Sequence, residues 1–84
     1  MAKISSDLEK QFKNDAHKMF NLIIRTEDAV ASHLAWFKAN DIDVKQQYRL
    51  VPGAAIACLG QNALALAEAE WIVSIEMDAS VRAL

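Results

Sequence analysis

The run VPGAAIACLGQNALAL, residues 51–66, lies in the longest uncharged segment of this 84-residue chain. It is too short, and too interrupted by Gly60 and the polar pair after it, to supply the roughly 20 apolar residues of a membrane span. Pro52 suits the first turn of a helix, where its missing N–H costs nothing. No proline follows it. We therefore expect a buried helix over residues 54–84, and no contact with a membrane.

Apolar residues recur along this segment at steps of three and four, which is the spacing of one helix face. Further apolar lines follow other faces, so the first half of the predicted helix is apolar nearly all round and needs more than one neighbour. Small residues there allow two helix backbones to approach closely, although alanine is also simply the best helix former. The main apolar line is Ile56, Leu59, Ala63, Leu66, Val73, Met77 and Leu84.

The first half of the chain also has helical spacing. Ser6-Asp7-Leu8-Glu9 has the pattern of a capping box, which predicts that a helix begins here. The apolar period continues to Phe37, and the predicted helix over residues 6–39 is either continuous or kinked near Thr26. It ends at Ala39-Asn40-Asp41, because Asn accepts the left-handed conformation after a helix. Residues 44–50, VKQQYRL, form a short helical connector.

These elements predict a single all-α domain over residues 1–84. Its fold is an antiparallel helical hairpin, in which two long helices are joined by the short connector. A chain of this size buries only about 60 to 65% of its unfolded surface, yet 54% of its residues are hydrophobic. We therefore expect homodimerisation into a four-helix bundle. The residues expected to mediate self-association are Met19, Ile23, Ile56, Leu59, Gly60, Ala63 and Leu64.

The net charge and the cysteine content bear on the possible partners and on the compartment of the protein. The net charge of −2 gives no uncompensated basic surface for nucleic acid. The lone Cys58 excludes an internal disulfide, and the N-terminal MAKISSDLEK lacks the apolar core of a secretory signal, so the cytoplasm is the expected compartment. Cys58 lies in the apolar run and is interpreted as a small buried hydrophobe, with a reactive thiol as the alternative.

No pattern in the sequence predicts catalysis, a cofactor or a metal site. His17 and His33 lie about four and a half turns apart on one predicted helix and cannot share a metal ion. The carboxylates near the C-terminus are spaced two residues apart, which points them in different directions. His33 is interpreted as a core or interface histidine, with pH sensing as the alternative. The sequence therefore does not predict an enzyme.

The remaining prediction is a protein that acts by binding another protein, as an adaptor, an assembly factor or an inhibitor. Trp, Tyr and Arg dominate interface energies, and they gather near the predicted connector, although the aromatic residues could equally close the end of the core. The alternative is a regulatory small-molecule-binding bundle with a pocket between protomers near Gln61, Asn62 and His33. The predicted partner-binding residues are Trp36, Phe37, Tyr48, Arg49 and Trp71.

Overall fold

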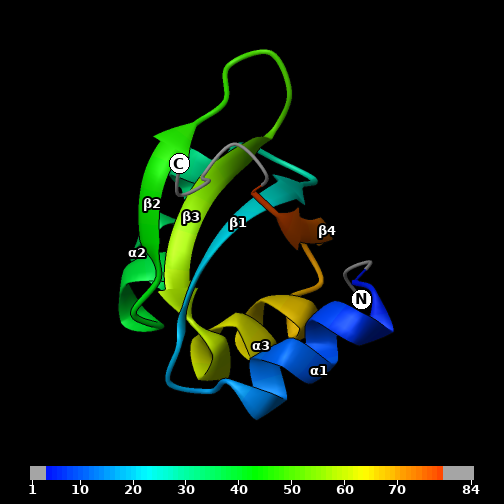
Figure 1. Ribbon diagram of the computed structural model, residues 1–84. Helices are drawn as coiled ribbons and strands as arrows, with labels where there is room; N and C mark the ends of the chain where they lie inside the picture. The colour runs from blue at the N-terminus through cyan, green and yellow to red at the C-terminus, as the bar shows by residue number, and fades with distance from the viewer. Residues whose placement is uncertain (1–3, 79–84) are drawn as a thin grey trace, which may run out of the picture.

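The computed structural model of the protein describes residues 4–78 (Figure 1). No helix within this range has both the length and the apolar character needed to cross a bilayer. The elements, in chain order, are α1 (Ser6–Asn14), β1 (Met19–Thr26), the 3-10 helix η1 (Val30–His33), α2 (Leu34–Ala39), β2 (Asp43–Gln47), β3 (Gly53–Leu59), α3 (Gly60–Glu68) and β4 (Ile72–Met77).

The prediction of an all-α helical hairpin, and of a four-helix bundle built from it, is wrong. The structure is an α/β fold with a four-stranded antiparallel sheet and three short α-helices. The uncharged run 51–66 is divided between β3 and α3, the predicted connector contains strand β2, and the predicted first helix is interrupted by β1. Pro52 lies in the turn between β2 and β3 rather than at the start of a helix.

The strands form where local composition favours them over a helix. In β1, Ile23, Ile24 and Thr26 are β-branched, and branched side chains lose less freedom in a strand than in a helix. Alternate residues of β1 are buried, as expected for a strand with one covered face. β3 is different, because six of its seven residues are buried. A short apolar run of this kind cannot be distinguished from a buried helix by its periodicity.

The sheet has the strand order β2-β3-β1-β4, and every neighbouring pair is antiparallel. Leu22 of β1 lies opposite Ile56 of β3 on one side and Met77 of β4 on the other. Strands β1 and β2 are therefore parallel with β3 between them, and β3 and β4 are parallel with β1 between them. This is the split β-α-β arrangement, used twice.

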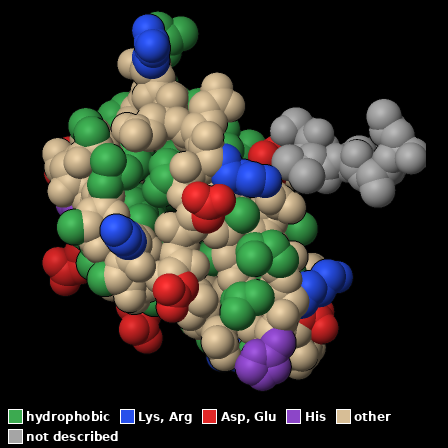
Figure 2. Space-filling model, turned by 90° about the vertical axis from the view of Figure 1, so that its left-hand side faces the viewer, with side chains coloured by type: hydrophobic (Ala, Val, Ile, Leu, Met, Phe, Trp, Pro, Cys, Tyr) green, Lys and Arg blue, Asp and Glu red, His purple; other side chains and the backbone are tan. Residues whose placement is uncertain are grey.

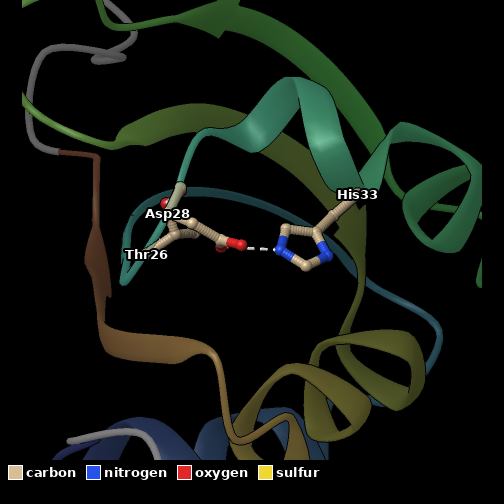
Figure 3. A network of polar contacts seen from close by, with 3 residues as sticks. All are labelled: Thr26, Asp28 and His33. Atoms are coloured by element: carbon tan, nitrogen blue, oxygen red, sulfur yellow. Dashed lines mark hydrogen bonds and ion pairs between the residues drawn. The ribbon is translucent and has the colours of Figure 1, made fainter.

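The helices leave one face of the sheet uncovered by any described element. α1 and α3 lie side by side (Figure 1), and the ring of Phe12 in α1 packs edge-on against Phe20 of β1 at 5.0 Å. Figure 3 looks at the covered side, where η1 lies in front of the strands. The largest fully buried side chains form the core between the sheet and the helices: Phe12, Phe37, Leu22, Ile24, Ile56, Leu66, Ile72 and Cys58.

Two helix boundaries agree with the sequence prediction. α1 begins at Ser6 as expected, but its cap is Ser5, one position before the predicted Ser6, and the Ser5 hydroxyl accepts the N–H of Leu8 at 3.1 Å. α2 ends at Ala39, where a helix end was predicted. The residue with positive φ is Asp41, at 57°, one position later than the Asn40 that was predicted. Local capping chemistry was therefore informative even where the fold class was not.

Gly60 lies where α3 approaches the end of α1 closely. A Cβ atom at this position would lie 2.6 Å from the carbonyl oxygen of Asp15 and 2.7 Å from that of Phe12, so only glycine fits. α3 has no side-chain cap. Instead, the N–H of Gly60 donates to the carbonyl of Lys18 and the N–H of Gln61 to the carbonyl of Ala16, both at 3.0 Å. These bonds satisfy donors that a helix start leaves without partners.

Candidate functional site

Three of the five predicted partner-binding residues form one aromatic cluster. Trp71 lies at its centre, with Trp36 perpendicular to it at 5.0 Å and Phe37 perpendicular at 5.5 Å. Phe37 is buried and the two tryptophans are half-buried. Edge-to-face pairs of this kind stabilise by about 0.5 to 1.5 kcal/mol each beyond the area that they bury. The cluster therefore closes one end of the core, and only the outer parts of the two tryptophans remain available to a partner.

His33 adds a further ring to this cluster and is hydrogen-bonded to Asp28 (Figure 3). Its ring stacks on Trp71 with the centroids 3.7 Å apart and the planes nearly parallel. Its Nε2 is hydrogen-bonded to Oδ1 of Asp28 at 2.7 Å, and the hydroxyl of the buried Thr26 donates to the carbonyl of Asp28. Asp28 thereby holds the imidazole over the indole. The hydrogen bonds of Thr26 and Asp28 therefore lie at the end of β1, where the helical pattern of the sequence is interrupted.

Tyr48 and Arg49 lie apart from this cluster, in the β2–β3 hairpin. The N–H of Tyr48 donates to the carbonyl of Gly53 at 3.0 Å, which closes the hairpin. A Cβ at Gly53 would lie 2.5 Å from the carbonyl of Ile24, so glycine is required where the hairpin meets β1. Arg49 is exposed and Leu50 beside it is 98% exposed. The predicted partner-binding residues therefore form two separate sets.

The residues predicted to mediate self-association are also divided by the fold. Ile56, Gly60 and Ala63 are buried within the chain itself, so these positions are already enclosed. Leu64 is half-buried on α3. The remaining three lie together on the uncovered face of the sheet: Met19, Ile23 and Leu59.

The uncovered face presents a short apolar strip between polar borders. Ile23 of β1 lies opposite Ala55 of β3, and Ala57 is the next residue of β3 on the same face. The two alanines are only 9% and 8% exposed. Lys45 of β2 crosses this face and donates to Oδ1 of Asn21 at 3.0 Å. The face is therefore flat, apolar along its middle and hydrogen-bonding at its border.

The other candidate groups have structural explanations. Cys58 faces the core, and burial raises the pKa of its thiol from 9.0 to about 11. This supports the interpretation of Cys58 as a buried hydrophobe, since a reactive thiol needs a lowered pKa and access to solvent. Within residues 4–78, no three His, Cys, Asp or Glu side chains are grouped to hold a metal ion.

The alternative small-molecule pocket was predicted near Gln61, Asn62 and His33, and the chain does not bring these residues together. Gln61 and Asn62 lie in the first turn of α3, against the segment that follows α1. His33 stacks on Trp71, which lies beyond the last turn of the same helix. A helix of this length separates the two positions.

Sequence reasoning missed the sheet face, because it depends on pairing between distant segments. Ala55, Ala57, Asn21 and Lys45 gain their significance only when β1, β2 and β3 lie side by side. One signal could have indicated the hairpin. Pro52-Gly53 separates a polar run from an apolar run of strand length, and such pairs mark turns.

No protein-family model matches this chain, and neither the curated proteins nor the solved structures contain a match to it.

Proposed function

We propose that this protein acts by binding another protein through the uncovered face of its sheet, as an adaptor, assembly factor or inhibitor without catalysis of its own. The observation that carries the proposal is a sheet face that no described element covers, on which Met19 is exposed and Ile23 and Leu59 are only partly buried. Sheets in stable folds bury their apolar faces against another layer. The buried, free Cys58 is compatible with a reducing compartment, and we propose the cytoplasm.

The composition of the face favours a protein partner. Its middle carries the partly buried Ile23, and its end carries Met19, which is 56% exposed. Arg25 and Glu76 add opposite charges at the border, which favours a partner with complementary polar groups over a purely apolar ligand.

Self-association is proposed on the same face, since Met19, Ile23 and Leu59 share it. Sedimentation of the purified chain across a dilution series tests this part separately. A dimer that the Ile23→Glu substitution dissociates would assign the face to a second copy. A monomer at all concentrations would leave the face to a different protein.

The main experiment places a photo-reactive amino acid at position 23 and identifies the protein cross-linked to it in cells. Binding of that purified partner is then measured by calorimetry with the wild-type chain and with Ile23→Glu. We expect Ile23→Glu to weaken binding about 100-fold, because burying an unpaired carboxylate at the centre of an interface costs several kcal/mol.

The matched control is Leu50→Glu, which makes the same chemical change at an exposed position in the β2–β3 turn. It should bind as the wild type does. Wild-type affinity in a folded Ile23→Glu variant would rule the uncovered face out as the binding surface.

A further inference from the structure

A groove of about 710 Å³ lies between α1 and the strand at the end of the sheet, β4, and reaches the border of the uncovered face at Glu76. Ile4 and Leu8 contribute apolar side chains from the α1 side, and Ile75 and Met77 contribute them from β4. Its volume falls in the range of about 300 to 1,000 Å³ that is usual for ligand sites in proteins.

The backbone of β4 offers hydrogen-bonding groups along this groove. Within the described residues, β4 pairs only with β1. The N–H of Asp78 donates to the carbonyl of Asn21 at 3.0 Å, and hydrogen-bonded pairs alternate along antiparallel strands. By this alternation, the N–H and C=O groups of Ile75 and Met77 point away from β1. They lie at the outer edge, where a further strand would bind.

The two edge strands, β2 and β4, differ in the features that prevent an exposed edge from pairing with a further strand. At one edge, β2 has charged or amide side chains at four of its five positions, and its register shifts between Val44 and Gln46. Charge and irregularity of this kind protect an exposed edge. Figure 2 views the molecule from this side and shows acidic and basic side chains among the hydrophobic ones. β4 carries no lysine, arginine or proline, and its exposed Val73 and Met77 are apolar.

We propose that β4 binds an extended peptide segment of a partner protein, which adds a fifth strand to the sheet beside α1. Both charged residues that line the groove, Asp7 and Glu76, are acidic. The occupant is therefore a segment with alternating apolar and basic side chains. A second copy of this chain would bring acid against acid, which opposes symmetric pairing of two β4 edges. Main-chain bonds give such a complex its affinity, and the side chains give it specificity.

The test uses an eight-residue peptide of alternating lysine and valine, titrated into the isotope-labelled chain and followed by NMR. We expect shifts in residues 74–77 and in α1, and slowed exchange of the amide protons of Ile75 and Met77. The same peptide with glutamate in place of lysine should bind at least about tenfold more weakly, the effect of one or two favourable charge pairs.

Substitutions at the groove make the test specific. The double variant Asp7→Lys with Glu76→Lys should lose affinity for the lysine peptide about tenfold and gain affinity for the glutamate peptide. Glu70→Lys, which alters an exposed acid that does not line the groove, is the matched control and should bind as the wild type does. Met19→Glu, at an exposed position of the uncovered face that does not pair with β4, should leave this binding unchanged, so this test and that of the proposed function can fail separately.

Three patterns of binding would overturn the inference. These are shifts confined to the uncovered sheet face, equal binding of both peptides, and protection of Ile75 and Met77 that depends on protein concentration instead of peptide concentration. Absence of binding at millimolar peptide would overturn it as well.

Discussion

The two faces of the sheet use the same strands for different purposes. On the covered face, Leu22 and Ile56 lie opposite each other, fully enclosed by α1, α3 and the aromatic cluster. On the uncovered face, Ile23, the sequence neighbour of Leu22, is only half-buried. Adjacent residues of one strand therefore differ in the free energy that they contribute to folding. The covered face stabilises the chain, and the uncovered face is available for recognition.

The largest effect should come from a neighbouring pair in β1. Leu22→Ala should lower the free energy of unfolding by about 2 to 5 kcal/mol, because it removes buried methyl groups and leaves a cavity. Ile23→Ala should cost about 1 kcal/mol or less, since this side chain is only partly buried. Urea denaturation of both variants measures the difference. Equal losses would mean that the two faces are equally covered.

A smaller effect is expected where the covering helices meet. Gly60→Ala should lower the free energy of unfolding by about 1 to 3 kcal/mol, because the new methyl group would overlap the carbonyls of Phe12 and Asp15. Gln61→Ala, one residue later and exposed, should change it by less than about 0.5 kcal/mol. Thermal denaturation of the pair measures this contrast. A neutral Gly60→Ala would show that α1 and α3 can move apart without loss.

The smallest effect is on the pH dependence of the covered face. The pKa of Cys58 is raised from 9.0 to about 11 in the folded chain, so folding favours the neutral thiol. The contribution of this group is complete below pH 9 and is lost as the pH rises from 9 to about 11, by up to about 2 kcal/mol. Urea denaturation at pH 7 and pH 10.5 should show this loss in the wild type. Cys58→Ala should lack that part of it, and an identical pH dependence in both would contradict the burial of the thiol.

Helix ends could be predicted from a few adjacent residues, whereas the pairing of strands could not. The cap at Ser5 and the helix end at Ala39 are encoded by a few adjacent residues, and they were predictable to within a position. β3 was not, because a strand that is buried on both faces has no alternation to distinguish it from a buried helix. Once β3 was interpreted as a helix, the alternate burial in β1 had no partner strand to explain it.

The candidate interaction surfaces were likewise predicted only in part. Sequence reasoning placed Met19, Ile23 and Leu59 among interaction residues from their apolar character, and the fold places all three on the uncovered face. It also grouped Trp36, Phe37 and Trp71, which the fold brings together in one cluster. The groove beside β4 could not be predicted, because Asp7 and Glu76 come from opposite ends of the chain and meet only through the sheet.

The way α3 begins has a consequence for the order of folding. α1 carries its own cap in Ser5 and can begin to form as soon as its few residues are available. α3 depends on the carbonyls of Ala16 and Lys18, which precede β1 in the chain. Its first turn can therefore be completed only after these two segments have met, which the pairing of β1 with β3 brings about. We therefore expect the first turn of α3 to form after this loop closure instead of nucleating the fold.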